Sequence, residues 1–114
     1  MTDCLFCRIL KGDLEARIVD QTDDWIAFHD VNPQAPLHVL IVPREHIATT
    51  NDLAERHDGL MGKMVRAAAG IAAGEGVAEE GYRLVLNTNP GAGQSVFHVH
   101  LHLLGGRALR WPPG

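Results

Sequence analysis

The sequence predicts an α+β fold with a largely antiparallel sheet, and three observations support this class. Short apolar segments with alternating polar residues recur along the chain, which is typical of β-strands. Only one long segment, from about residue 53 to residue 73, has the spacing of an amphipathic helix. The strand segments are grouped around this helix instead of alternating with helices, as a parallel α/β sheet would require.

The first half of the chain is expected to form a short helix and three strands. Gly12 ends the helix, because glycine readily adopts the left-handed conformation that commonly follows a helix. The two prolines of the loop at residues 32–36 remove hydrogen-bond donors and fix φ. In order, the elements are the helix at residues 4–11, strands at 18–19 and 25–29 with a polar turn at 20–24 between them, and an apolar strand at 38–42 that Pro43 closes.

The long helix carries one continuous apolar stripe and four glycines. Residues 49–52 offer N-cap side chains before it. Each glycine weakens the helix by roughly 0.5–1 kcal/mol relative to alanine. Such small residues allow close packing, either against the chain's own sheet or against a partner helix in a dimer, and both alternatives stay open. The stripe consists of Met61, Met64, Val65, Ala68, Ile71 and Ala72, and the glycines are Gly59, Gly62, Gly70 and Gly74.

Two further strands are expected after the helix, at residues 82–88 and 96–104. In the first of them, Leu84 and Leu86 share one face, and Arg83, Val85 and Asn87 share the other. A glycine-containing loop at residues 89–94 joins the two strands.

Length and charge limit the possible partners. The 114 residues are expected to form a single domain, 1–114, of ordinary hydrophobic content at 46%. The net charge of −4 argues against a general nucleic-acid binder, whose phosphate contacts need a basic surface. No apolar stretch is long enough to span a membrane, and the N-terminus lacks the pattern of a secretory signal. We therefore expect a cytoplasmic protein with no nucleic-acid or membrane partner.

A row of alternating histidines is the strongest functional signal. Residues 98–104 read His-Val-His-Leu-His-Leu-Leu. Alternate residues of a strand share a face, so the three histidines stand on one side and the apolar residues on the other. Neutral imidazole acts as a nucleophile, a proton shuttle or a metal ligand near neutral pH. A solvated strand face with the same alternation is the alternative interpretation.

The segment that leads into this row has the features of a phosphate-binding loop. Residues 91–96 read Gly-Ala-Gly-Gln-Ser-Val. Glycine lets the backbone approach a ligand closely, and successive N–H groups in a turn can hold an anion. Gln94 and Ser95 add side-chain donors. An ordinary hairpin turn is the alternative, but its place directly before the histidines favours the phosphate loop.

These segments together resemble the histidine triad (HIT) superfamily, most closely its Hint branch of nucleoside phosphoramidases. The family motif is His-x-His-x-His-x-x with apolar residues at x, and residues 98–104 fill every position. Residues 28–38 are similar to the family's nucleotide-binding segment, and the tail Trp-Pro-Pro-Gly at 111–114 points to Hint. The related nucleotidyltransferase branch has Gln at the third histidine, where this chain keeps His102. The resemblance spans nearly the whole chain and implies a HIT-like fold, with a five-stranded antiparallel sheet, one long helix and a short N-terminal helix.

The resemblance implies that His100 is the nucleophile, and the chemistry agrees. A neutral imidazole can attack the α-phosphorus if its other nitrogen keeps the proton, and a backbone carbonyl acceptor would fix that tautomer. A nucleotidyl-histidine intermediate would form, and water would then release the nucleoside monophosphate. The leaving amine needs a general acid. His102 and His98 are the near candidates, with His102 preferred as a phosphate contact, and His38 resembles the family's buried supporting histidine.

The resemblance also implies a purine nucleotide site. Asp30 resembles the family's ribose ligand, with a turn-capping residue as the alternative. Ser95, Gln94 and the backbone amides of residues 93–96 would hold the phosphate oxygens together with Asn87, and Ser95 is counted as catalytic. Trp111 lies in the tail that reaches across the dimer in Hint proteins. The expected purine contacts are Phe6, Ile9, Phe28 and Val31, for which ordinary core packing is the alternative. Asp30 is expected at the ribose, and the expected phosphate contacts are Asn87, Gly93, Gln94, Ser95, Val96, His100 and His102.

A second site involves the two cysteines. Cys4 and Cys7 have the C-x-x-C spacing, which in a cytosolic chain favours metal ligands or redox thiols over a structural disulfide. In other HIT proteins this pair is completed by residues like His46 and His98 here. The four would make a closed Cys₂His₂ structural zinc site. Free thiols are the alternative, and zinc on His98 would remove it as a proton donor.

The expected function is hydrolysis of purine nucleoside 5′-phosphoramidates, which are AMP or GMP conjugates, by a homodimer without a catalytic cofactor. A dinucleoside polyphosphate hydrolase of the same superfamily is the second candidate. A metal-dependent enzyme that uses the histidine row as ligands, and a nucleotide sensor or scaffold with residual catalysis, are candidates from other classes. His29 and His57 have no assigned role and are expected at the surface.

Overall fold

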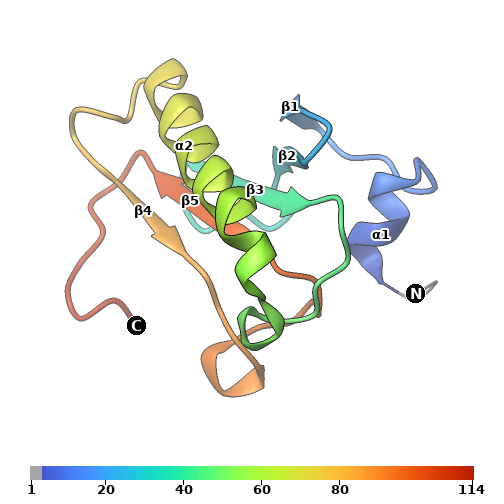
Figure 1. The fold of residues 1–114 in the computed structure, drawn as a ribbon. Coiled ribbons are helices and arrows are strands. Elements are labelled where there is room, and N and C mark those ends of the chain that lie inside the picture. Colours follow the sequence, from blue (N-terminus) through green and yellow to red (C-terminus); the bar gives the residue numbers. More distant parts are fainter. Residues whose placement is uncertain (1–3) are drawn as a thin grey trace.

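The computed structural model describes residues 4–114, so the first three residues of the N-terminal segment lie outside the described part. Five strands form one antiparallel sheet in the order β1-β2-β3-β5-β4. The strands are β1 (Ile18–Gln21), β2 (Trp25–His29), β3 (Leu37–Pro43), β4 (Tyr82–Val85) and β5 (Leu101–Gly105), and the α-helices are α1 (Leu5–Leu10) and α2 (Asp58–Gly74). The predicted α+β class and HIT-like architecture are confirmed (Figure 1).

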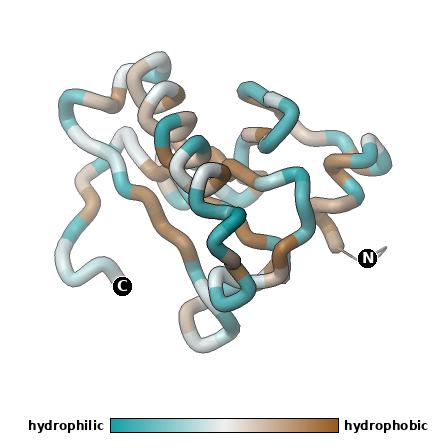
Figure 2. The backbone as a smooth tube through the Cα atoms, in the orientation of Figure 1, coloured by the Kyte–Doolittle hydropathy of each residue, from teal (hydrophilic) through white to brown (hydrophobic). Residues whose placement is uncertain are grey.

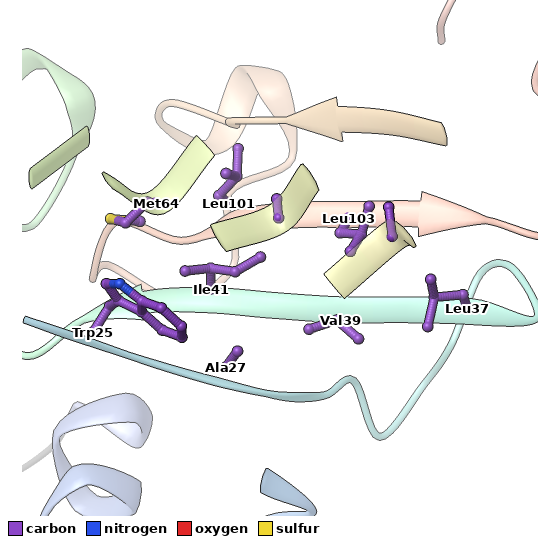
Figure 3. Close-up of a cluster of buried hydrophobic side chains, with 10 residues drawn as sticks. Trp25, Ala27, Leu37, Val39, Ile41, Met64, Leu101 and Leu103 are labelled. Atoms are coloured by element: carbon purple, nitrogen blue, oxygen red, sulfur yellow. The ribbon is translucent and has the colours of Figure 1, made fainter. Parts of the chain in front are cut away.

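Each face of the sheet packs against one helix. Helix α2 crosses one face, and its buried Met64, Ala68 and Ala72 contact the sheet (Figures 1 and 3). Helix α1 contributes Phe6 to a smaller cluster on the opposite face. Strand side chains alternate between the two clusters, as a two-sided sheet requires. The α2 cluster contains Trp25, Ala27, Leu37, Val39, Ile41, Leu101 and Leu103, and the α1 cluster contains Ile26, Phe28, Leu40 and Val42.

The hydropathy of the chain follows this arrangement. Figure 2 shows hydrophobic residues along the strands and mostly hydrophilic residues in the loops that join them. Strand β3 is buried over its whole length, because it lies in the middle of the sheet and is covered on both faces. Strand β4 is at an edge of the sheet and is only half-buried.

The predicted start of the long helix was wrong. The expected helix from about residue 53 begins only at Asp58, after two short 3₁₀ turns, η1 (Thr50–Asp52) and η2 (Glu55–His57). Thr49 does act as an N-cap, and it forms a capping box with Asp52, but this cap serves the first 3₁₀ turn. The chain then returns to extended backbone at Leu53, which separates the turn from the helix.

The apolar stripe of α2 is narrower than expected. Met64, Ala68 and Ala72 are fully buried, whereas Val65 is 44% exposed. A side chain built at any of the four helical glycines would meet no atom of this chain within contact distance. These glycines are therefore not required for close packing on the chain's own sheet.

The last two strands are shorter than predicted. Strand β5 begins at Leu101, so His98 and His100 precede it instead of belonging to it. The amide of Val99 donates to the carbonyl oxygen of Ile47, 2.7 Å away, and not to a neighbouring strand. Strand β4 ends at Val85, opposite His102 and one residue before the start of β5 is reached. Leu84 is partly buried against the α2 cluster, whereas Leu86, beyond the end of β4, is 39% exposed.

Candidate active site

The histidine row lies on the α1 face of the sheet, at the entrance to β5. His98 and His100 are buried, and His102 is half-buried within the strand. The rings of His100 and His102 are 4.9 Å apart between centroids. The intervening Val99 and Leu101 are buried, with Leu101 on the α2 face. The alternation that the sequence suggested is thus retained, although only His102 of the three is in a regular strand.

His100 is held in one tautomer by the main chain. Its Nδ1 lies 2.8 Å from the carbonyl oxygen of His98. A carbonyl oxygen can only accept, so Nδ1 carries the hydrogen and Nε2 of the neutral ring keeps its lone pair. Burial lowers the pKa of His100, against a smaller opposing effect of the hydrogen bond to His98 and of Asp30. The ring is therefore neutral and nucleophilic at Nε2.

Phe6 supports the nucleophile from α1. Its ring contacts that of His100 edge-on at 4.9 Å between centroids, and it also contacts Phe28 at 5.6 Å and His98 at 6.0 Å. Edge-to-face aromatic contacts of this kind favour a defined ring orientation. Phe6 and Phe28 are buried and belong to the α1 cluster, and Ile9 packs against that cluster. Phe6 thus joins the α1 cluster to the histidines, whereas Phe28 is a core residue and Ile9 packs at the margin of the cluster.

His38 and His102 form a second pair. Nε2 of His38 lies 2.9 Å from Nδ1 of His102, and the backbone amide of Gln34 donates to Nδ1 of His38 at 3.0 Å. Burial lowers the pKa of His38, and burial together with His100 and His38 lowers the pKa of His102 to about 4. Asp30 lies beside this pair, with Oδ2 3.4 Å from Nε2 of His38.

Asp30 also caps the turn that follows it. Its Oδ1 accepts a hydrogen bond from the amide of Asn32 at 2.8 Å. The turn-capping role is therefore present, and the side chain of Asp30 is 19% exposed. Val31, next in the chain, is 98% exposed and so lines no formed slot within this chain, in contrast to the predicted purine contact.

The predicted role of the Gln94 side chain is not supported by its hydrogen bonds. Gln94 is buried, its Nε2 donates to the carbonyl oxygens of Ala48 and Val96, and its Oε1 accepts from the amide of Asn89. Both amide hydrogens are thus engaged in holding the loop together. The sequence could not show this, because nothing in the local sequence distinguishes a buried glutamine that holds a loop together from an exposed glutamine that binds phosphate.

Two of the four expected loop amides are likewise engaged. The amide of Gly93, which has a φ of 91°, donates to the carbonyl oxygen of Pro90, and that of Gln94 to the carbonyl oxygen of Asn89. Within the described residues, the amides of Ser95 and Val96 have no backbone acceptor outside the regular elements. Ser95 is exposed and Asn87 half-buried. The loop amides that remain available to hold an anion are therefore those of its last two residues, shortly before the histidines.

Cys4, Cys7, His46 and His98 meet at the base of α1. Nδ1 of His98 lies 3.4 Å from Sγ of Cys4, 3.6 Å from Sγ of Cys7 and 3.2 Å from Nδ1 of His46, and Sγ of Cys7 lies 3.3 Å from Nδ1 of His46. Ordinary zinc bond lengths in a tetrahedron place sulfur and nitrogen about 3.5 Å apart, and two nitrogens about 3.3 Å apart. The donor set fits this geometry, and all four ligand atoms lie within 4.8 Å of one another.

The other nitrogen of His98 is also engaged. Its Nε2 lies 2.8 Å from the carbonyl oxygen of Pro43, so Nε2 carries the hydrogen and Nδ1 is free to face the sulfurs. A carbonyl partner of this kind orients the histidine ligands of metal sites. Burial lowers the pKa of His98. With both nitrogens occupied, His98 is poorly placed to transfer protons to a substrate.

Comparison with known proteins identifies the family. The profile of the HIT domain matches residues 11–109. The chain belongs to the HIT family. It is 48% identical to the purine nucleoside phosphoramidase of Escherichia coli over 107 residues, which cover 94% of this chain and 90% of that enzyme. It is also 46% identical to an uncharacterised HIT-like protein of Synechococcus elongatus, over 98% of this chain and 97% of the relative.

Solved HIT structures share the whole fold. A HIT family hydrolase from Legionella pneumophila superposes with a TM-score of 0.96 at 49% identity, over 98% of this chain and 100% of that one. A second, from Clostridium thermocellum, superposes with a TM-score of 0.93 at 43% identity, over 96% of both chains. The protein is therefore a nucleotide hydrolase of the HIT family.

Two histidines without an assigned role, His57 and His29, were expected at the surface. His57, expected at the surface, is buried, with Nδ1 accepting from the amide of Ala54 and Nε2 3.1 Å from Oε2 of Glu45. It joins η2 to the loop after β3, which carries His46. His29 is half-buried.

None of the helices in the part of the chain that the structure describes is long and apolar enough to cross a membrane.

The pH dependence of hydrolysis should reflect the buried histidines. His100 must be neutral to attack, and burial lowers its pKa, so it stays neutral as the pH falls through the ordinary histidine value of about 6.5. We expect kcat/KM for a substrate that does not itself ionise in the scanned range to decline only below that value. Circular dichroism at each pH controls for unfolding. An acid limb at or above about 6.5 would contradict the assigned environment.

Proposed function

We propose that this protein hydrolyses the P–N bond of purine nucleoside 5′-phosphoramidates, with adenosine 5′-monophosphoramidate as the representative substrate. The observation that carries the proposal is His100, a buried imidazole whose Nδ1 hydrogen is held by a main-chain carbonyl, so that Nε2 is free to attack. The similarity to the purine nucleoside phosphoramidase of Escherichia coli supports the same substrate class.

The reaction runs in two displacements. Nε2 of His100 attacks the α-phosphorus, and the electron pair of the P–N bond goes to the leaving nitrogen, which takes up a proton from solvent and departs as the amine. A nucleotidyl-histidine remains. Water then attacks the same phosphorus and gives up a proton to solvent, the electron pair of the bond to His100 returns to Nε2, and the nucleoside monophosphate is released with the histidine restored. The carbonyl of His98 accepts from Nδ1 throughout, which stabilises the positive charge of the substituted ring.

The phosphate is held by donors on three sides of the attacking nitrogen. The free amides of Ser95 and Val96 and the hydroxyl of Ser95 approach from the loop, His102 from β5, and Asn87 from the segment after β4. Donors fixed before the reaction stabilise the charge that develops on the phosphoryl oxygens. His98 is left out of this set because both of its nitrogens are engaged.

The nucleoside lies along the α1 side of the sheet. Oδ2 of Asp30 accepts from the ribose hydroxyls, while its Oδ1 stays on the turn. Phe28 and Ile9 give an apolar floor at the edge of the α1 cluster, and exposed Val31 covers the base from outside. AMP and GMP conjugates both satisfy these contacts.

Removal of the nucleophile tests the proposal. We expect His100→Ala to lower kcat on adenosine 5′-monophosphoramidate by at least about a thousandfold, because no other group takes over the attack. Rapid acid or alkaline quenching followed by mass spectrometry should show an AMP adduct on the unmodified protein and none on the variant. His102→Ala is the comparison variant, which should form the adduct slowly. A near-normal rate in His100→Ala would overturn the assignment.

The same assays distinguish the proposed function from the competing ones. A dinucleoside polyphosphate hydrolase would have the higher kcat/KM on diadenosine polyphosphates than on the phosphoramidate. A sensor or scaffold would bind AMP tightly but turn over neither substrate. We propose the phosphoramidase because the chain is 48% identical to the purine nucleoside phosphoramidase of Escherichia coli, and because Ser95 at the proposed phosphate site is exposed.

We further propose that Cys4, Cys7, His46 and His98 hold a structural zinc ion. The donor atoms fit a closed tetrahedral site, and such zinc contributes folding energy and no open position for chemistry. It would join α1 to the loop after β3 and to the histidine row. Phe6 lies between the two cysteines in sequence and packs on His100, so the metal site and the nucleophile share one support.

Metal removal should therefore lower stability. The protein as purified should contain one equivalent of zinc by elemental analysis. Chelation should lower Tm by at least about 10 °C, since a loss of about 2 kcal/mol moves Tm by this amount in a domain of this size. Cys7→Ser should lose the metal and show the same low Tm, with no further change on adding chelator. An unchanged Tm in both cases would reject the site.

A homodimer is the proposed assembly. Val65 is exposed on α2 between the small residues Gly62 and Ala69, and β4 leaves one side of the sheet unpaired. Trp111 is 82% exposed, so it does not pack on its own subunit. The tail is instead held along β4, where Arg83 donates to the carbonyl oxygen of Arg110 at 2.9 Å. These surfaces together fit a partner of the same kind.

A charge on the outer face of α2 tests this assembly. We expect the protein to sediment with the mass of two chains and Val65→Glu to sediment as one, because an unpaired carboxylate would be buried in the interface. Leu5→Glu is the matched control, since Leu5 and Val65 are each 44% exposed but Leu5 is on α1. Both variants should stay folded. A monomeric unmodified protein, or a dimeric Val65→Glu, would contradict the proposed interface.

A further inference from the structure

A chain of hydrogen bonds that starts at the main chain reaches His102. The amide of Gln34 donates to Nδ1 of His38, at 3.0 Å. An amide nitrogen can only donate, so Nδ1 of His38 must be the unprotonated nitrogen. His38 is 5% exposed, and burial lowers its pKa, so the ring is neutral. The one hydrogen of this neutral ring is therefore on Nε2.

The position of that hydrogen determines the state of the next ring. Nε2 of His38 lies 2.9 Å from Nδ1 of His102. Because Nε2 of His38 carries a hydrogen, Nδ1 of His102 must accept it, and His102 keeps its own hydrogen on Nε2. His100 has the opposite arrangement, with its hydrogen on Nδ1. Neighbouring histidines of the row thus present different groups, a lone pair from His100 and an N–H from His102.

The surroundings of His102 oppose a second proton. That proton would have to sit on Nδ1, where it would point at the hydrogen of His38 across 2.9 Å. The groups that face His102 are His100, His38 and Asp30, and the residue opposite on β4 is the apolar Val85. Asp30 is the only anion among them, and its Oδ2 is 3.4 Å from Nε2 of His38, beyond the nearer partner His102.

The same three residues could also be considered as metal ligands. One atom each of Asp30, His38 and His102 lie within 4.8 Å of one another. A metal on Nε2 of His38 would require the hydrogen on Nδ1, where it would face the amide hydrogen of Gln34. The main-chain amide therefore favours the hydrogen-bond chain over a metal.

We propose that His38 is a positioning residue that keeps His102 neutral with its hydrogen on Nε2, so that His102 is a fixed hydrogen-bond donor to the substrate phosphoryl group beside the attacking lone pair of His100. The proposal rests on the proposed phosphate site. It attributes the position of the hydrogen on His102 to the amide of Gln34, which acts through His38. It involves a hydrogen bond and transfers no proton.

Nitrogen NMR of the imidazole rings tests the chain directly. In the ¹⁵N-labelled protein as purified, long-range ¹H–¹⁵N spectra at neutral pH should show the Nε2–H tautomer for His38 and His102. Addition of AMP should shift Nε2 of His102 and leave its tautomer unchanged. An Nδ1–H tautomer or an imidazolium at His102 would overturn the proposal, as would loss of these signals on adding one equivalent of Mn²⁺ to the protein as purified.

Two substitutions at His38 separate positioning from packing. Glutamine has an acceptor and a donor that can replace Nδ1 and Nε2–H, whereas leucine has neither. We expect His38→Leu to lower kcat by about 10- to 100-fold with a smaller change in KM, as is typical when the orienting partner of a site histidine is lost. His38→Gln should recover most of this loss. In His38→Leu the hydrogen that opposes a second proton on His102 is gone, whereas burial and His100 still lower the pKa of His102, so the acid limb should move to higher pH and stay below about 6.5.

Equal losses in the two variants with an unchanged pH profile would overturn the positioning role. If either variant fails to fold, the NMR measurement on the unmodified protein still decides the tautomer. The outcome is also distinct from failure of the proposed function. A protein that does not hydrolyse phosphoramidates would fail the activity assay, but its His38 and His102 tautomers and the AMP-induced shift could still be read.

Discussion

The hydrogen bond from Nδ1 of His100 to the carbonyl oxygen of His98 is the constraint on which the rest of the site depends. It decides which nitrogen of the nucleophile is free, and it does so through the main chain, so the choice is independent of solvent. The carbonyl can hold this position because the His98 ring is anchored on both sides, by the carbonyl of Pro43 and by the cluster of Cys4, Cys7 and His46. One residue thus links the sheet, the N-terminal helix and the reacting atom.

This arrangement explains why β5 begins only after the second histidine. In a regular antiparallel ladder the carbonyl of His98 would face a neighbouring strand, and the ring of His100 would have no main-chain acceptor within the same segment. In the loop conformation before Leu101, the carbonyl of His98 and the ring of His100 can bond to each other. The amide of Val99 donates to the carbonyl oxygen of Ile47 instead. The sheet is shorter as a result, and the last pair between β4 and β5 joins Val85 to His102, next to the start of β5. The late start of β5 thus goes together with the main-chain acceptor of His100.

Sequence reasoning located the strands, both helices and every histidine of the row, because these depend on periodicity and on local end signals. Gly12 and Pro43 mark element ends by their own backbone preferences, which need no tertiary information. It failed where the outcome depended on partners far along the chain. Gln94 holds a loop together because Ala48 lies beside it, and the buried His57 contacts Glu45, twelve residues earlier in the chain. None of these contacts has a signature in the local sequence.

Burying several imidazoles in a small domain is unfavourable unless each polar nitrogen finds a partner, and here the partners also assign the roles. A main-chain carbonyl gives His100 a free lone pair, a main-chain amide gives His102 a free N–H through His38, and a carbonyl with two sulfurs takes His98 out of proton chemistry. In the proposed function, three identical side chains thus become a nucleophile, a donor and an anchor. The three histidines are equivalent in the motif. Their roles differ because each ring is linked to a different main-chain group. Any HIT chain that keeps the histidines but alters the turn at Gln34 would then be expected to keep its nucleophile and lose its donor.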